Sequence, residues 1–172
     1  MAPVGIHPMH AQHWPAVRAI YQAGIDTGHA TFESRAPESF ETWLQSQVAE
    51  LCLVAGDGGT ALGWAALGPV SSRCVYAGVG EVSVYVDPSH QRRGIGRALL
   101  AALIGRSEQR GYWTLQAGIF PENAGSVALH QALGFHLLGL RRGLCRMSFG
   151  PLAGRWRDVL YLERRSQRVG VD

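Results

Sequence analysis

A basic, glycine-containing loop next to a helix carries the clearest chemical signal in the sequence. The run Gln91–Gly96 (QRRGIG) leads into a helical pattern with Ile95, Leu99 and Leu103 on one side. A helix N-terminus attracts anions through its free N–H groups and its dipole, and glycine lets the backbone come close to them. The loop therefore predicts a phosphate site. It matches neither GxGxxG nor the Gly-Lys-Ser/Thr phosphate loop, which disfavours nucleotide binding by those two routes.

A carboxylate begins the strand that precedes this loop. Val82–Val86 alternates valine with Ser83 and Tyr85, the period of a half-buried strand, and the turn Asp87-Pro88-Ser89 ends it. Period two places Glu81, Ser83 and Tyr85 on one face. A carboxylate there is costly to bury unless it has a partner or a use. On these residues alone, an ordinary exposed strand-end glutamate is the preferred interpretation of Glu81, with a general base as the alternative.

The elements that would position these residues alternate along most of the chain. Asp57-Gly58-Gly59 indicates a hairpin, and Asn123 is a plausible helix N-cap. Strands are expected at 4–6, 51–55, 61–67, 81–86, 112–119, 135–140 and 156–162, and helices at 14–25, from 37, from 95 and at 123–133. The segment 141–154 is expected to be a loop, and the polar tail after about 165 is expected to fray.

Composition narrows the classes of protein that fit the chain. Its 172 residues suggest one domain, and 47% hydrophobic residues allow a sizeable core. The net charge of +3, without interleaved aromatics, does not argue for nucleic acid. Cys52, Cys74 and Cys145 fit neither a disulfide framework nor a metal site. With no leader or membrane-spanning run in the sequence, a cytoplasmic protein without a metal is expected.

The order of motifs resembles the GNAT superfamily of N-acetyltransferases, whose acyl-CoA loop reads Gln/Arg-x-x-Gly-x-Gly/Ala. The resemblance covers nearly the whole chain and is sharpest with the phosphinothricin and methionine sulfoximine N-acetyltransferases. It rests on these motifs: Thr31-Phe32, Arg73-x-x-Tyr76, Glu81–Val86, Gln91–Gly96, Asn123-x-x-Ser126-Val127 with His130, Leu133-Gly134-Phe135 and Gly154-x-Trp156-x-Asp158-Val159. It implies an α+β, three-layer GNAT fold with a mixed sheet of about seven strands and about four helices.

The resemblance also implies acetyl-CoA as cosubstrate and a set of residues that hold it. Val84–Val86 would pair with the pantetheine arm, and the backbone N–H of Tyr85 would meet the oxyanion. Asn123 would contact the carrier, with a pure helix cap as an equal alternative. Ser126 is a further candidate contact. The pyrophosphate would lie on the loop formed by Gln91, Arg92, Arg93, Gly94, Ile95, Gly96 and Arg97.

Catalysis and acceptor binding are implied in the same way. Glu81 matches the family's base, and His130 matches a histidine discussed for catalysis, although a packed or capping histidine fits it equally well. No tyrosine follows Asn123 on that helix, so the thiolate's proton could come from Ser126 or solvent. Arg73 and Tyr76 would bind the acceptor, and Phe32 and Trp156 would wall its pocket, with core packing as their alternative.

Three functions remain open at this point. The first is acetyl transfer to the amine of a small amino acid or analogue, carried out by a homodimer. The second is the same fold with a polyamine, an arylamine or a protein N-terminus as acceptor. The third is a non-catalytic acyl-CoA sensor. The segment 141–154 differs from the family's pattern, which leaves the acceptor undecided.

Overall fold

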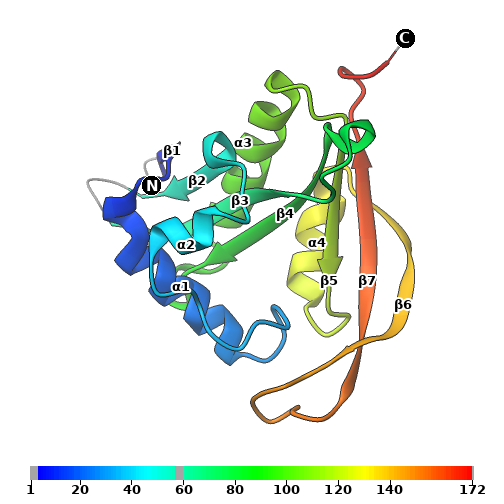
Figure 1. Ribbon diagram of the computed structural model, residues 1–172. Helices are drawn as coiled ribbons and strands as arrows, with labels where there is room; N and C mark the ends of the chain where they lie inside the picture. The colour runs from blue at the N-terminus through cyan, green and yellow to red at the C-terminus, as the bar shows by residue number, and fades with distance from the viewer. Residues whose placement is uncertain (1–3, 57–59, 172) are drawn as a thin grey trace.

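The computed structural model describes residues 4–56 and 60–171 and contains a seven-stranded mixed sheet (Figure 1). Its strand order is β1-β2-β3-β4-β5-β7-β6, and only the β4–β5 pair is parallel. The strands are β1 Ile6–Pro8, β2 Cys52–Ala55, β3 Gly63–Pro69, β4 Val79–Val86, β5 Thr114–Ile119, β6 His136–Arg146 and β7 Trp156–Arg165. The helices are α1 Trp14–Asp26, α2 Phe40–Leu44, α3 Ile95–Gln109 and α4 Ala124–Ala132. The expected GNAT architecture is confirmed.

Helices cover both faces of the sheet, because alternate residues of each strand point to opposite sides. Leu53 and Ala65 pack with α3 in one core, whereas Val54 and Trp64 pack with α1 and α2 in another. Figure 1 shows these two layers of helices on either side of the strands. The hydrophobic patterns that predicted the helices therefore belong to two separate cores.

Strands β4 and β5 pair only at their beginnings and then separate (Figure 1). Their register joins Val79–Glu81 to Thr114–Gln116 and ends there, while β4 stays paired with β3 as far as Val86. The second half of β4 thus has an edge that β5 does not cover. This edge lies next to the glycine loop, since α3 begins nine residues after the end of β4.

Several expected boundaries differ from the structure. Helix α2 begins at Phe40 rather than at 37, because the Ser39 hydroxyl accepts the Thr42 N–H as an N-cap. The first strand begins at Ile6 rather than at 4. The Asp57-Gly58-Gly59 hairpin lies outside the described residues.

The late arginine-rich segment 141–154 was expected to be a loop, and this was wrong for residues 141–146. Strand β6 continues to Arg146, so β6 and β7 form a long hairpin that extends beyond the rest of the sheet (Figure 1). Two shifts of register interrupt this hairpin, one between Leu137 and Gly139 and one between Arg141 and Cys145. Gly, Arg and a short apolar pattern concealed a strand that is exposed on most positions.

The tail after β7 was expected to fray, but the structure ties it down. The Ser166 hydroxyl donates to Glu108 at 2.9 Å, and Arg165 donates to the carbonyl of Val169 at 2.8 Å. Arg165 also reaches the Trp113 carbonyl of the loop before β5 at 3.1 Å. These bonds hold the segment against the C-terminal half of α3.

Candidate acetyl-CoA and acceptor site

The glycine loop has the backbone geometry of an anion site. Arg92 (φ 59°) and Gly94 (φ 80°) both adopt left-handed conformations, and Arg92 is the one non-glycine residue with positive φ in the described chain. The first intrahelical bond runs from the Ala98 N–H to the Gly94 carbonyl, so earlier N–H groups of that turn have no partner within the helix. Turns of this kind direct successive N–H groups into a concavity that suits phosphate.

Gly96 lets this loop lie close to β4. A Cβ at Gly96 would meet Leu129 of α4 at 3.3 Å and Val86 of β4 at 3.4 Å. The side chains of Gln91, Arg92, Arg93 and Arg97 are all exposed, while Ile95 is buried in the core. The buried Ile95 therefore anchors a loop whose polar and cationic groups remain available to a ligand.

The open edge of β4 carries backbone groups of alternate residues. The Asp87 N–H donates to the Leu62 carbonyl, just before β3, at 2.9 Å. Since strand residues direct their N–H groups to alternate sides, the Tyr85 N–H also faces β3, where its partner is Trp64. The N–H groups of Val84 and Val86 face the uncovered edge instead. The expected oxyanion donor at Tyr85 is therefore corrected to one of these valines.

The Tyr85 side chain is part of an aromatic cluster under α1. Its ring stacks on Trp64 with centroids 4.6 Å apart, and Tyr21 meets it edge-on at 5.0 Å. Burial, the nearby Tyr21 phenol and Glu33 raise the pKa of Tyr85, against a hydrogen bond with Thr31, so the phenol stays neutral. This cluster packs against the face of β4 that also carries Glu81.

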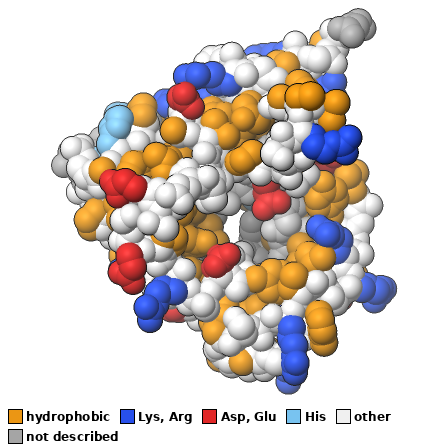
Figure 2. Space-filling model, viewed as in Figure 1, with side chains coloured by type: hydrophobic (Ala, Val, Ile, Leu, Met, Phe, Trp, Pro, Cys, Tyr) orange, Lys and Arg blue, Asp and Glu red, His pale blue; other side chains and the backbone are white. Residues whose placement is uncertain are grey.

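A cavity of about 300 Å³ lies where β4 and β5 separate. Figure 2 shows a hollow near the centre of this face. Glu81 is the only titratable residue in its lining, which consists of Ser46, Gln47, Gly68, Pro69, Val70, Glu81, Ser83 and Gln116. The Glu81 carboxylate accepts a hydrogen bond from Gln116 Nε2 at 3.3 Å. This geometry provides an acceptor-sized space with one carboxylate in it.

His130 lies in the helix packing rather than in this cavity. Its side chain is 3% exposed, and its ring meets Phe135 edge-on at 5.0 Å. Nδ1 donates to the Ser126 carbonyl at 2.7 Å, because a carbonyl can only accept. Burial lowers the pKa of His130, against that hydrogen bond, and favours a neutral ring. The packed, hydrogen-bonded alternative fits this environment.

Asn123 caps α4 and also holds a distant loop. Its Oδ1 accepts the Ser126 N–H at 3.2 Å, and its Nδ2 donates to the His29 carbonyl at 3.4 Å. The helix-cap alternative is therefore present, and one amide hydrogen remains for another contact. Ser126 is half-buried one turn before His130.

The four expected acceptor residues do not form one pocket in the chain. Phe32 packs edge-on against Phe120 at 4.9 Å in a small core cluster, whereas Trp156 is 66% exposed on the β6–β7 hairpin. Arg73 lies with its guanidinium 5.7 Å from the Tyr76 ring, on the exposed turn before β4. Arg73 and Tyr76 are brought together, and Phe32 and Trp156 are not.

The loop that carries Phe32 is held by a buried arginine that sequence reasoning missed. Arg157 of β7 donates to the Gly28 carbonyl at 2.7 Å and to His29 Nδ1 at 3.0 Å. It also pairs with Glu122 at 3.3 Å and lies 4.0 Å above the Phe120 ring. Its spacing of two from Val159 was the available signal, since an arginine in phase with a buried strand position requires partners.

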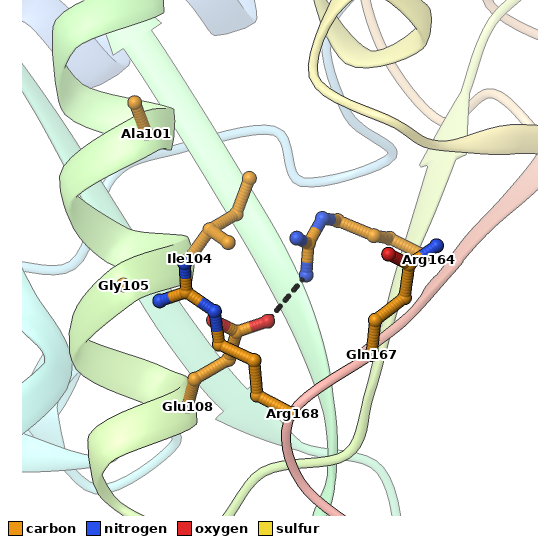
Figure 3. Close-up of a pocket in the computed structure, with 7 residues that line it drawn as sticks. All are labelled: Ala101, Ile104, Gly105, Glu108, Arg164, Gln167 and Arg168. Atoms are coloured by element: carbon orange, nitrogen blue, oxygen red, sulfur yellow. Dashed lines mark hydrogen bonds and ion pairs between the residues drawn. The ribbon is translucent and has the colours of Figure 1, made fainter. Parts of the chain in front are cut away.

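A second cavity, of about 330 Å³, lies between α3 and the C-terminal segment (Figure 3). Glu108 and Arg164 form an ion pair at 2.9 Å at its border. Burial would raise the pKa of Glu108, but hydrogen bonds from Arg164 and Ser166 and nearby positive charge keep it below its usual value. The carboxylate is thus committed to fastening the tail. None of the predicted site residues lines this cavity.

Comparison with known proteins decides which family this geometry belongs to. The model of the acetyltransferase (GNAT) family matches residues 14–135. The chain belongs to the GNAT family of acetyltransferases. The family model ends before β6, so the long β6–β7 hairpin lies beyond the matched region.

Named relatives of this GNAT chain act on amino-acid analogues. It is 34% identical to the phosphinothricin N-acetyltransferase of Alcaligenes faecalis, over 87% of this chain and 76% of that protein. It is 30% identical to an L-methionine sulfoximine/L-methionine sulfone acetyltransferase of Pseudomonas aeruginosa, over 87% of each chain. The predicted subgroup is confirmed as a relationship by sequence.

A solved relative identifies the cosubstrate. The phosphinothricin acetyltransferase of Sinorhizobium meliloti, crystallised with acetyl-CoA, matches with a TM-score of 0.84 and 30% identity, over 97% of this chain and 90% of that chain. Acetyl-CoA is the cosubstrate of this GNAT enzyme. In the described residues, no helix is long and apolar enough to cross a membrane, and no group of three candidate ligands could hold a metal ion.

Proposed function

We propose that the protein transfers the acetyl group of acetyl-CoA to the amine of a small amino acid or amino-acid analogue of the phosphinothricin or methionine sulfoximine type. The observation that carries the proposal is the position of Glu81, which lines the cavity between β4 and β5 beside the open edge of β4. A carrier along that edge would present its thioester to an amine in the cavity. The named relatives support the class of acceptor.

The pyrophosphate of acetyl-CoA would lie on the loop from Gln91 to Arg97. Its backbone N–H groups and exposed arginines supply positive potential, and the loop sequence contains no acidic residue. The pantetheine arm would continue as an added strand along Val84–Val86, since those N–H and C=O groups on the β5 side have lost their β partner. Asn123 and Ser126, at the start of α4, would flank the arm.

The chemical step would use Glu81 as general base, directly or through one water. The carboxylate takes a proton from the ammonium, and the neutral amine attacks the thioester carbonyl. The C–N bond forms, the C–S bond breaks, and coenzyme A leaves as the thiolate, which takes up the second proton released by the attacking nitrogen, directly or through solvent, while Glu81 returns its proton to solvent. The Val84 N–H would donate to the oxyanion of the tetrahedral intermediate, a role that Tyr85 cannot fill in this register.

Arg73 and Tyr76 would bind the acceptor's carboxylate at the mouth of the site. An arginine can clamp a carboxylate through two parallel hydrogen bonds. The cavity itself contains no cation, so a second anionic group on the acceptor would need a charge from elsewhere. Phe32 and Trp156 would contact the acceptor only if assembly with a second copy of the chain brings them to the site.

A homodimer would supply that assembly. Strand β6 is at the edge of the sheet, and exposed apolar side chains gather on the β6–β7 hairpin: Leu137, Leu138, Leu140 and Trp156. Unpaired edges and exposed apolar patches are usually covered in native proteins. A second copy of the chain would bury this surface and place the exposed Trp156 in an interface.

A protein N-terminus is the second candidate acceptor. The solved ribosomal-protein-alanine N-acetyltransferase of Brucella melitensis matches with a TM-score of 0.83 and 31% identity, over 94% of this chain and 99% of that chain. The likeness in fold is as close as that of the phosphinothricin enzyme, so fold alone does not choose between the two acceptors.

Release of free thiol from acetyl-CoA tests the proposal. The protein is incubated with acetyl-CoA and phosphinothricin, methionine sulfoximine, methionine sulfone, glutamate, spermidine or an alanine-starting peptide. We expect release with one or more of the first three and an acetylated product of the matching mass. Release with the peptide alone would replace the proposed acceptor, and no release with any amine would favour an acyl-CoA sensor.

A further inference from the structure

Three polar side chains form a row across neighbouring strands on the acceptor face of the sheet. Glu81 of β4 lies directly opposite Gln116 of β5. Tyr161 of β7 is paired with Gly118, so it lies on the same face as Gln116, one pleat farther along. The intervening pair, Ala117 and Leu162, points into the opposite core. The row therefore crosses the point where β4 and β5 begin to separate.

Two hydrogen bonds connect the row, and their directions are determined by the groups involved. Gln116 Nε2 donates to Glu81 Oε2 at 3.3 Å, and the Tyr161 hydroxyl donates to Gln116 Oε1. An ionised carboxylate can only accept, so the amide nitrogen must face Glu81. The amide oxygen then faces Tyr161, which must be the donor. The orientation of the whole row follows from the charge on Glu81.

The charged groups around the row keep Tyr161 a donor. Burial, Glu163 opposite Gln116 and Glu81 itself all raise the pKa of Tyr161, against Arg141 of β6, which lowers it. The remaining lining of the cavity contributes no titratable group besides Glu81. The phenol is therefore protonated at any pH at which an acetyltransferase would be assayed.

We propose that Gln116 and Tyr161 are positioning residues that hold one oxygen of the Glu81 carboxylate, leaving its other oxygen for the amine or its water. The inference rests on the proposed role of Glu81 as general base. Gln116 acts directly on the carboxylate, and Tyr161 acts through Gln116 by fixing the orientation of its amide. The row thereby gives the Glu81 carboxylate a defined orientation at the edge of the cavity.

The pH dependence of turnover carries the signature of this arrangement. A hydrogen bond to an ionised carboxylate favours the ionised form over the protonated form. When the bond from Gln116 is lost, the acidic limb of the turnover profile is expected to move to higher pH. Lost packing alone would lower the rate or stability without moving this limb.

The test measures kcat/KM for the acceptor against pH in the full chain, with one amine throughout. The variants are Gln116→Leu, Tyr161→Phe and the double variant, with Tyr112→Phe as the control because Tyr112 packs at the other end of β5. We expect an upward shift of the acidic limb in the first three, no larger in the double variant than in Gln116→Leu. Binding of acetyl-CoA by calorimetry is expected to be unchanged.

Glu81→Gln separates the two possible failures. If Glu81→Gln loses turnover but the Gln116 and Tyr161 profiles coincide with that of the native protein, the row has no positioning role. Independent, additive shifts would contradict the claim that Tyr161 acts through Gln116. If Glu81→Gln keeps full turnover, the base assignment fails and the inference fails with it. Tyr161→Phe keeps the aromatic ring, so its pH profile can be measured even if Gln116→Leu does not fold.

Discussion

Gly94 contributes to the predicted phosphate site through its backbone conformation rather than through lack of space. Its φ is 80°, and a Cβ placed there would meet nothing within 4 Å. The open space beside it is where a pyrophosphate would lie. Gly111, beyond the other end of α3, has nearly the same φ of 85° and equally empty surroundings. The two glycines thus have similar backbone conformations and surroundings, and only Gly94 lies at a predicted ligand site.

This pair gives a matched prediction. We expect Gly94→Val and Gly111→Val each to lower the free energy of unfolding by at least about 1–2 kcal/mol, because both force a side chain into a left-handed conformation. Only Gly94→Val is expected to abolish binding of acetyl-CoA in calorimetry. Equal affinity in the two variants would remove the loop from the cofactor site.

The sequence was more informative about which residue types are present than about the directions in which their backbone N–H groups and side chains point. The spacing of Gln91–Gly96 predicts a phosphate loop, and the left-handed conformations of Arg92 and Gly94 are compatible with that prediction. The expected N–H donor at Tyr85 was wrong because the direction of a strand N–H depends on which neighbour the residue faces. Whether an N–H group of β4 faces β3 or the open edge is set by the pairing of β4 with β3, and no local sequence pattern shows it. Gln116 was missed for the same reason, since its place beside Glu81 depends on the β4–β5 register.

At the scale of elements, Arg157 connects three segments that are distant in sequence. It joins β7 to the loop after α1, through Gly28 and His29, and to the loop before α4, through Glu122. A single buried guanidinium with several acceptors is well suited to this, because its donors lie in a fixed plane. The loop it holds carries Phe32, which would contact the acceptor in the proposed dimer.

We therefore expect Arg157→Leu to raise the KM for the acceptor amine about tenfold, a change equivalent to ~1.4 kcal/mol, and to leave the KM for acetyl-CoA unchanged. Stability is expected to fall by about 1–3 kcal/mol, because buried acceptors lose their partner. Steady-state kinetics and denaturant unfolding measure the two effects. Arg157→Lys should recover part of the acceptor KM.

Arg164→Leu is the matched control. Arg164 is another arginine of β7 with a carboxylate partner, Glu108, at 2.9 Å, but it fastens the tail to α3 away from the β4–β5 cavity (Figure 3). Its loss should lower stability without changing the acceptor KM. If both variants raise that KM equally, the effect is general loosening of the fold and not positioning of the Phe32 loop.

The limits of sequence reasoning were greatest at the β6–β7 hairpin. Strand periodicity is readable when alternate side chains face a core, as Val82, Val84 and Val86 do, but β6 has few buried positions and two shifts of register. A strand at the edge of a sheet, with both faces partly exposed, lacks the alternation that would identify it. The same exposure is what makes this hairpin a candidate surface for a second copy.

For the whole molecule, we expect the native chain to sediment as a dimer and Leu138→Glu to sediment as a monomer. Leu138 is exposed at the first register shift of β6, and a charge there would be desolvated by a partner. Val171→Glu is the control, because Val171 is also exposed and apolar but lies outside the hairpin. A native monomer, or dimers of both variants, would place the interface elsewhere.

Two cores, a sheet that divides between β4 and β5, and the glycine loop are the features on which the proposed acetyl-CoA site depends. The order of elements could be predicted from the sequence because apolar residues recur with a local period in α1, α3, α4 and most strands. The separation of β4 from β5 could not be predicted, since it results from how the strands pack in space. It is this separation that creates both the cavity and the open edge.

The most direct test of the account is the paired behaviour of Glu81→Gln. Glutamine keeps the size of the side chain and removes its basicity, and Glu81 makes no contact with the glycine loop among the hydrogen bonds of the described residues. We predict unchanged affinity for acetyl-CoA by calorimetry and a loss of turnover at neutral pH of about 10²-fold or more, the range for removal of a general base. Full turnover at neutral pH with normal acetyl-CoA affinity would contradict the central claim.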